Sequence, residues 1–424
     1  MRYRSRVLIL LFLLSIITYI DRVCISVAGP RMQHDLNISP ERWGWVVGAF
    51  TISYALFEIP SGAMADRIGA RAVLTRIVLW WSAFTSLTGV VSNYFVLLAV
   101  RFAFGAGEAG AYPGSTSAVS RWFPSAERAK ATGVVWMASR IGGAISPLLV
   151  VWIQQRYGWR MSFYVFGAVG AVWCAFWYWW YRDHPAHMPG ISQAELDEIG
   201  GGSPKAHHGL PWGRALRSAN YWKLLLMYHT YCWGSYFYLS WLHTYLQKGR
   251  GFTENEMALA ATLPFVLGAT CNLMGGVLSD RLIRSKGLRF GRRVVGAMGL
   301  ALAGCFMLAT SQTPNKYLAV LFLALGYGAM DTMLPVAWAV CLDIGGRYAG
   351  AVSGSMNMAG QFGSFLSSVI FGYIVAWTNH NYNAPLLPMG CMLLLSAFLF
   401  SRIDPTVPLV DEGEESRREL KQAA

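Results

Sequence analysis

The chain has 424 residues, of which 54% are hydrophobic and only 13% charged, and its mean hydropathy is +0.37. Soluble proteins carry about 25% charged residues, so this composition argues against a water-soluble globular protein. The net charge of +13 does not indicate nucleic-acid binding, because the basic residues lie between apolar segments, where they act as topology signals. We expect a lipid bilayer around the chain and no nucleic-acid partner.

Apolar segments of roughly the 20 residues that a membrane helix needs recur along the whole chain. The first follows three arginines in the manner of a signal peptide, but it contains Asp21 and Arg22 and lacks a convincing cleavage site, so we interpret it as a membrane helix. Twelve transmembrane helices of an all-α membrane protein are predicted, at residues 7–29, 43–65, 72–92, 94–120, 129–153, 160–181, 221–246, 257–283, 293–312, 315–342, 347–377 and 385–402.

The one long connector covers residues 183–220 and is polar and rich in Gly and Pro, which is typical of a linker. It predicts an N-terminal six-helix bundle at 1–182, a cytoplasmic linker at 183–220, a C-terminal six-helix bundle at 221–402 and a cytoplasmic tail at 403–424. Lys and Arg are concentrated in alternate loops, on the side of both chain ends. This bias predicts that both termini are cytoplasmic.

A Gly-x-x-x-Asp-Arg motif occurs twice, starting at Gly62 after the second predicted helix and at Gly276 after the eighth. Matching loops at corresponding places indicate two six-helix halves that repeat around a central cavity. We assign these loops a gating role, with residues Gly62, Asp66, Arg67, Arg71, Asp280 and Arg281.

These motifs resemble those of the major facilitator superfamily, and Arg101 to Gly107 fits its R-x-x-x-G-x-G pattern. The sequence Tyr19-Ile20-Asp21-Arg22 resembles the Tyr-x-Asp-Arg of the anion:cation symporter family, and Trp241-Leu242 with Thr244-Tyr245-Leu246 resembles the end of its seventh helix. The resemblance implies the major facilitator fold, with two pseudo-symmetric halves. It also implies proton-coupled transport of anions such as galactonate, hexuronates, glucarate, tartrate or phthalate.

Three positions depart from the family pattern. His243 stands where the family usually has Pro, Arg140 where its fifth helix has a small or amide residue, and Gln361 where Asn is frequent. These departures concern the identity of the substrate and leave the transport class unchanged.

Four charged residues lie in otherwise apolar helices: Asp21, Arg22, Arg101 and Glu108. A charge at the centre of the bilayer costs roughly 2.5–3.5 kcal/mol, so such residues indicate function. We expect Arg22 and Arg101 to bind the anion, because guanidinium groups grip carboxylates with two parallel hydrogen bonds. We expect Asp21 and Glu108 to carry protons, because burial favours the neutral form of an acid. In the alternative interpretations Arg101 and Glu108 only neutralise each other, and Asp21 is a structural residue that pairs with a neighbouring helix.

Polar and aromatic side chains are predicted to complete the substrate site. The full predicted set is Tyr19, Arg22, Tyr54, Arg101, Arg140, Tyr231, Trp338, Asn357 and Gln361. Packing or interfacial roles are the alternative for each Tyr and Trp. The eight His and seven Cys are scattered without metal-ligand or disulfide spacing. We expect no metal and no cofactor, with protons as the coupling ion.

Arg140 and Asp331 are also charged at predicted membrane depth. Arg140 could contact a second carboxylate of the substrate, pair with Asp331 across the two halves, or find a separate partner.

The sequence therefore predicts a monomeric, proton-coupled symporter in a bacterial inner membrane that imports an organic anion, of the galactonate, hexuronate or glucarate type, by alternating access. A short first outer loop around Asn37 favours the bacterial assignment. A dicarboxylate or aromatic-acid carrier and a non-transporting membrane sensor are the alternatives. An enzyme is not expected, since no nucleophile–base pair is recognisable.

Overall fold

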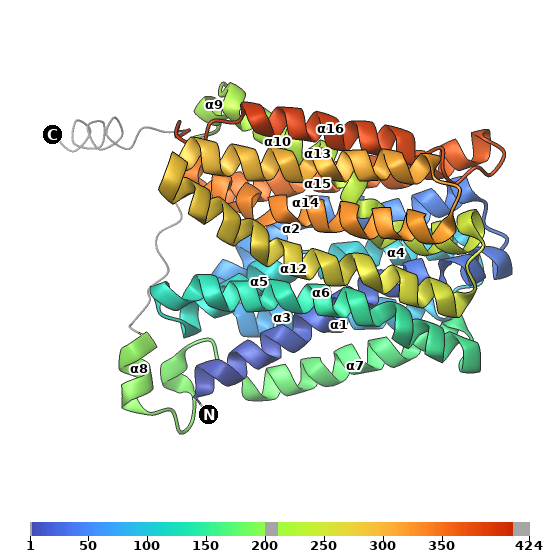
Figure 1. Cartoon of the computed structure of the whole chain (residues 1–424). Helices are drawn as coiled ribbons and strands as arrows, with labels where there is room; N and C mark the ends of the chain where they lie inside the picture. Colours follow the sequence, from blue (N-terminus) through green and yellow to red (C-terminus); the bar gives the residue numbers. More distant parts are fainter. Residues whose placement is uncertain (1, 200–210, 410–424) are drawn as a thin grey trace. The chain divides into compact units, whose positions relative to one another are not determined.

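The computed structural model describes residues 2–199 and 211–409, and within these ranges the chain is helical and contains no β-strand (Figure 1). The long helices are α1 (Tyr3–Asp35), α2 (Pro40–Ile68), α3 (Ala70–Thr88), α4 (Tyr94–Glu108), α5 (Ala111–Trp122), α6 (Ser125–Tyr157), α7 (Trp159–Trp180), α10 (Ala219–Ser240), α12 (Glu254–Lys286), α13 (Leu288–Gln312), α14 (Lys316–Gly345), α15 (Ala349–Trp377) and α16 (Leu386–Arg402). Shorter elements are η1 (Pro185–His187), α8 (Gln193–Ile199), α9 (Trp212–Ala215), α11 (Leu242–Thr244), η2 (Tyr245–Gly249) and η3 (Gly346–Tyr348).

Each predicted apolar segment coincides with one of these helices or with a run of adjacent ones. By length and composition, eight spans in the described residues are sufficient to cross a membrane, and α16 is a shorter apolar helix. Several helices extend beyond their predicted bounds. For example, α1 runs for 33 residues, because its first turns continue past the apolar stretch into the basic N-terminus.

Two predicted helices are interrupted. The segment 94–120 is divided into α4 and α5 at Gly110, whose φ of +95° is a left-handed conformation that glycine adopts without a Cβ clash. The segment 221–246 is divided near Trp241 into α10, α11 and η2. Interrupted membrane helices expose backbone groups, and they are tolerated only where protein covers them.

Corresponding helices of the two halves begin in the same way. The side chain of Asn93 caps α4 by accepting a hydrogen bond from the Val96 amide, and that of Asn315 caps α14 by accepting from the Tyr317 and Leu318 amides. Asn is among the preferred N-cap residues. These are the fourth and tenth predicted membrane helices, so the local capping repeats with the six-helix period.

Contacts between Cα atoms divide the chain into two compact units. Unit 1 comprises 1–205, 236–266 and 364–385, and unit 2 comprises 206–235, 267–363 and 386–424. Unit 1 thus combines the N-terminal helices with the adjoining ends of α10, α12 and α15. The division into bundles at 1–182 and 221–402 with a linker and a tail remains a prediction from the sequence.

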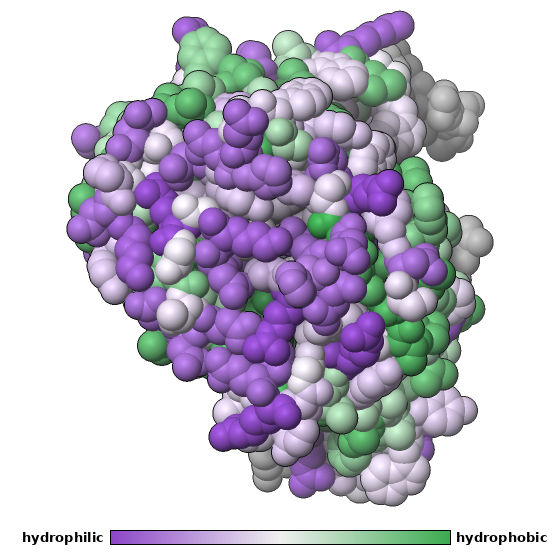
Figure 2. Space-filling view, turned by 90° about the vertical axis from the view of Figure 1, so that its right-hand side faces the viewer, coloured by the Kyte–Doolittle hydropathy of each residue, from purple (hydrophilic) through white to green (hydrophobic). Residues whose placement is uncertain are grey.

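The surface of the helices carries many large hydrophobic side chains. Leu79, Phe95, Val172, Met274 and Trp377 are each more than half exposed. Exposed apolar side chains in such number are unusual on a soluble protein and are expected where lipid is the solvent. Hydrophilic side chains gather instead on the end of the molecule where α1 ends and α7 begins (Figure 2).

Candidate functional site

The centre of unit 1 contains an ion pair between two membrane helices. The Nε of Arg22 on α1 donates a hydrogen bond to a carboxylate oxygen of Glu108 at the end of α4. The Glu108 side chain is fully buried, and that of Arg22 is about 10% exposed. A buried pair of this kind offsets much of the cost of each charge, and removal of one partner leaves the other uncompensated.

Aromatic rings surround the Arg22 guanidinium. Its Cζ lies 4.8 Å from the ring centroid of Tyr54, 5.3 Å from Phe50, 5.7 Å from Tyr19 and 6.0 Å from Tyr112. Cations are attracted to aromatic faces within about 6 Å. The rings come from α1, α2 and α5, so they hold the guanidinium in place from several directions.

Two further charged groups lie near this pair. Arg101 on α4 has its Cζ 4.7 Å from the ring of Phe104 and 5.1 Å from that of Phe50, so the Phe50 ring is close to both guanidinium groups. Asp21 is buried and interacts electrostatically with both Glu108 and Arg101. Among the described residues, neither carboxylate oxygen of Asp21 has a hydrogen-bond partner. The Nε of Arg101 also has none in this part of the chain.

Small residues bring the helices of this cluster together. A Cβ on Gly105 of α4 would lie 2.4 Å from the carbonyl oxygen of Phe50, so only glycine allows α4 to approach α2 this closely. A Cβ on Gly142 of α6 would lie 2.6 Å from the carbonyl oxygen of Ile16 and 3.1 Å from the Cβ of Tyr19. The glycines therefore position α4 and α6 against the helices that carry the aromatic rings.

Within unit 1, contacts between helices also close the region of α1 that follows Arg22. Ser26 donates to the carbonyl of Ser240 at 3.0 Å, and its hydroxyl lies 2.9 Å from Nδ1 of the buried His243. Further along, Arg31 pairs with Glu254 at the start of α12, with Nη2 2.7 Å from a carboxylate oxygen. These contacts connect α1 to the segments 236–266.

The remaining predicted binding residues are distributed over both units. Arg140 is a buried residue of α6 in unit 1. Unit 2 carries Tyr231 on α10, Trp338 on α14, and Asn357 and Gln361 one turn apart on α15. The structure therefore brings Tyr19, Asp21, Arg22, Tyr54, Arg101 and Glu108 together in unit 1. The binding roles of the whole set remain predictions.

Asp331 is fully buried in α14 of unit 2, where a Cβ on Gly268 would lie 2.8 Å from its Oδ2. Arg140 and Asp331 belong to different units. Whether Arg140 pairs with Asp331 or contacts substrate therefore stays a prediction.

The predicted gating residues are partly described. Arg71 donates to the carbonyl of Tyr178 at 2.6 Å and lies over its ring, and Asp280 lies 3.5 Å from Arg292, which also pairs with Asp343 at 2.9 Å. Arg281 is exposed. The side chains of Gly62, Asp66 and Arg67 lie outside the described residues.

Three features of this cluster were not predicted from the sequence: the direct Arg22–Glu108 pair, the Phe50 ring close to both guanidiniums, and Tyr112. Tyr112 also stacks on Trp136 at 4.4 Å. It lies four residues beyond Glu108, which would be one turn in the continuous helix predicted at 94–120, and this spacing was the available signal. In the structure the helix is interrupted at Gly110, between these two residues. Phe50 gives no such signal in an aromatic-rich sequence.

Comparisons with known proteins agree with this architecture. The model of the Major Facilitator Superfamily matches residues 11–368. A protein described as a probable sulfoacetate transporter of Cupriavidus necator is 36% identical, over 99% of this chain and 98% of its own length. A probable galactarate/D-glucarate transporter of Bacillus subtilis is 30% identical over 91% and 88% of the two chains, and a D-galactonate transporter of Escherichia coli is 29% identical over 94% and 95%.

Solved structures support the same fold. A bacterial homologue of the human lysosomal transporter Spinster superposes with a TM-score of 0.76 at 20% identity, covering 95% of this chain and 97% of its own. A D-xylose–proton symporter gives a TM-score of 0.75 at 16% identity, covering 96% and 98%.

The chain belongs to the major facilitator superfamily and, within it, to the anion:cation symporter family. It is a multi-pass membrane transporter and not an enzyme. The prediction of the twelve-helix major facilitator fold is confirmed.

Proposed function

We propose that this protein imports an organic anion together with protons across a bacterial inner membrane, as a monomer with both termini in the cytoplasm. The observation that carries the proposal is the buried Arg22–Glu108 pair, with Asp21 and Arg101 beside it. The names of the relatives, which include sulfoacetate, galactarate/D-glucarate and galactonate transporters, support an anionic substrate.

The arrangement supports a simple coupling mechanism. While Glu108 is ionised, it occupies the Arg22 guanidinium and competes with any carboxylate. A proton on Glu108 removes this competition, so that Arg22 can grip the anion with two parallel hydrogen bonds. Release of the proton restores the internal pair and expels the anion. Protons and the anion therefore bind together, which is the requirement for symport.

A count of charges gives the second half of the proposal. With Asp21 and Glu108 both protonated, Arg22 and Arg101 remain and their two positive charges can be neutralised by a dianion. A monoanion entering with two protons would instead carry one net positive charge inward, which gains about 2.3 kcal/mol per 100 mV of membrane potential. Uptake of a monoanion is then driven by the potential as well as by the pH gradient.

The substrate that we place first is a sugar acid such as a galactonate or an aldarate. A compact dianion such as sulfoacetate is the second candidate. It is favoured by the sulfoacetate relative, which is 36% identical to this chain, whereas the two sugar-acid relatives named above are 30% and 29% identical.

Alternating access requires the cluster to be reached from each side in turn. The contacts of Ser26 with His243 and of Arg31 with Glu254 follow Arg22 along α1, with Arg31 about 13 Å beyond it by helical rise. We propose that these contacts form an outer gate that opens once per cycle.

The proposal is tested by uptake into proteoliposomes under an imposed pH gradient, with labelled sulfoacetate, galactarate and galactonate offered separately. Accumulation of one of them that collapses with a protonophore is expected. A membrane sensor would bind the same anion without accumulation.

A further inference from the structure

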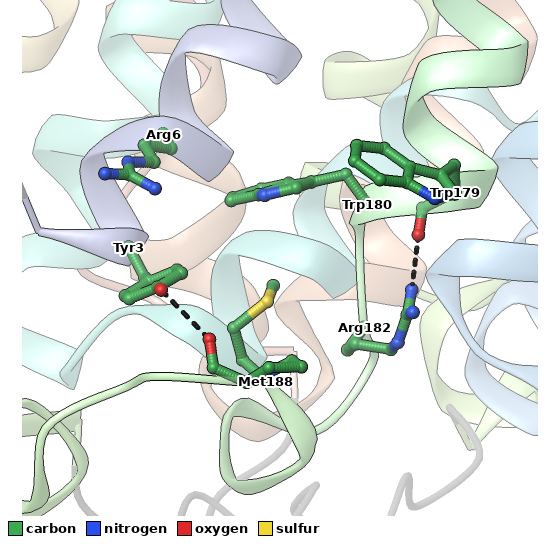
Figure 3. Close-up of a pocket in the computed structure, with 7 residues that line it drawn as sticks. Tyr3, Arg6, Trp179, Trp180, Arg182 and Met188 are labelled. Atoms are coloured by element: carbon green, nitrogen blue, oxygen red, sulfur yellow. Dashed lines mark hydrogen bonds between the residues drawn. The ribbon is translucent and has the colours of Figure 1, made fainter.

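A pocket of about 250 Å³ lies in unit 1, where α1 begins and α7 ends (Figure 3). It shares no lining residue with the buried charge cluster of Arg22 and Glu108. Its walls come from the first turn of α1, the last residues of α7 and the segment that follows α7. The lining residues are Tyr3, Arg6, Trp179, Trp180, Arg182, Met188 and Pro189.

Two guanidinium groups border this pocket. Arg6 is exposed and lies 5.0 Å above the ring of Tyr3. Arg182 uses Nη1 to donate to the carbonyls of Trp179 and Tyr181, at 2.8 and 2.9 Å. Neither arginine forms an ion pair with any residue in the described part of the chain. The remaining guanidinium N–H groups therefore favour an anion that no residue in the ranges 2–199 and 211–409 supplies.

The acidic residues in this region are engaged elsewhere. Glu198 pairs with Arg2 and Arg4, and Glu195 accepts a hydrogen bond from the Arg4 amide at 2.9 Å. Asp183, which adjoins Arg182 in sequence, accepts a hydrogen bond from the Arg71 amide at 3.1 Å. These three carboxylates thus bond other groups, and no acidic residue is among those that line the pocket in the described part of the chain.

The aromatic residues indicate the depth at which the pocket lies. Tyr3 stacks on Trp180 at 6.3 Å, and Trp179 is 70% exposed at the end of an apolar helix. Trp and Tyr gather at the boundary between headgroups and hydrocarbon. One and two turns back along α7, Phe176 and Val172 are exposed by 47% and 71%, which provides an apolar surface leading away from the pocket.

We propose that this pocket binds the phosphate group of an anionic phospholipid, with Arg6 and Arg182 on the phosphate and the acyl chains along the exposed face of α7. Basic pockets between membrane helices are a known type of anionic headgroup site. The pocket combines cations with aromatic residues and adjoins an exposed apolar surface. A free phosphate would make no contact with that apolar surface, whereas the acyl chains of a lipid would.

The test measures thermal stability and lipid retention of the full chain in detergent. Phosphatidylglycerol should raise the unfolding temperature more than phosphatidylcholine or inorganic phosphate at equal phosphate concentration. Native mass spectrometry should show phosphatidylglycerol retained after partial delipidation. Replacement of both cations, Arg6→Gln with Arg182→Gln, should weaken phosphatidylglycerol binding at least about tenfold, since both charge-assisted hydrogen bonds to the phosphate are lost.

The single variant Arg6→Gln is the milder test, because Arg6 is exposed and its side chain makes no hydrogen bond with the residues that the structure describes. Arg156→Gln is the matched control: Arg156 is also exposed and lies 4.4 Å over the ring of Trp152, but it does not line this pocket. Unchanged phosphatidylglycerol binding in the Arg6 and double variants, or an equal loss in the control, would overturn the proposal. Equal stabilisation of the unmodified protein by phosphatidylcholine or by inorganic phosphate would overturn the assignment to an anionic lipid.

Discussion

Arg22 on α1 and Glu108 on α4 form a buried ion pair although 86 residues separate them in sequence. The pair joins Arg22, the cation that we propose binds the substrate, to Glu108, the acid that we propose carries the proton. In the proposed mechanism, therefore, loading of a proton and exposure of the anion site are one event.

Glu108→Gln is predicted to abolish proton-driven accumulation. The amide keeps the size of the side chain but carries neither the charge that competes for Arg22 nor a titratable proton. Exchange of labelled for unlabelled substrate should continue, because exchange needs no net proton cycle. Counterflow and gradient-driven uptake are the paired assays, with Glu256→Gln, at the N-terminal turn of α12, as a control for loss of an acid elsewhere. Gradient-driven accumulation at the normal level would remove Glu108 as a proton carrier.

Asp21→Asn is also predicted to abolish proton-driven accumulation of the anion and to leave the exchange of labelled for unlabelled substrate intact. Asp21 is buried beside Glu108 and Arg101 without a hydrogen-bond partner among the described residues. The measurement is the number of protons taken up per anion, which should fall in this variant. An unchanged ratio would show that Asp21 is structural.

Arg101→Ala and Arg22→Ala are each predicted to weaken substrate binding by about 1.5–3 kcal/mol, the value of a hydrogen bond to a charged group. Lys at either position should restore the positive charge but cannot form two parallel hydrogen bonds to one carboxylate. At position 22, Lys also lacks the planar guanidinium that packs among the rings of Tyr54 and Phe50. Isothermal titration in detergent measures both. Affinity equal to that of the unmodified protein in either alanine variant would exclude that arginine from the anion clamp.

Most of the helices could be predicted from the sequence. The length of an apolar segment indicates a membrane helix, and the Lys and Arg content of the loops indicates on which side of the membrane each loop lies. The break at Gly110 was not predicted, since a local left-handed residue leaves the hydropathy of 94–120 unchanged. The charged residues of the cluster were predicted to be functional because a charged side chain in the bilayer is costly in free energy. The pairing of Arg22 with Glu108 was missed because it depends on how closely α4 approaches α1 and α2, which the glycine contacts decide.

The outer gate predicts that joining α1 to α12 stops transport. A cysteine pair, Arg31→Cys with Glu254→Cys, linked by a short bifunctional thiol reagent should block uptake while substrate still binds, and cleavage of the linker should restore uptake. The exposed native Cys305 and Cys391 are replaced by serine in the background. Each single cysteine variant, treated identically, serves as the control. Full uptake with the link in place would remove this contact from the transport cycle.

Charge reversal decides between the interpretations of Arg140 and Asp331, both buried in their own units. If they pair during the cycle, Arg140→Asp and Asp331→Arg should each fail, and the double variant should recover part of the transport. If Arg140 binds a second carboxylate, the double variant stays inactive and Arg140→Gln shifts preference from dianions to monoanions. Competition of galactarate against galactonate measures that preference.

The central claim, that an organic anion and protons move together through the cluster of Arg22 and Glu108, is tested most directly in proteoliposomes with a pH indicator inside and a labelled anion outside. We expect entry of the anion to acidify the interior without an imposed gradient, and we expect Glu108→Gln to exchange anion without acidification. Anion entry with no proton movement in the unmodified protein would contradict the account.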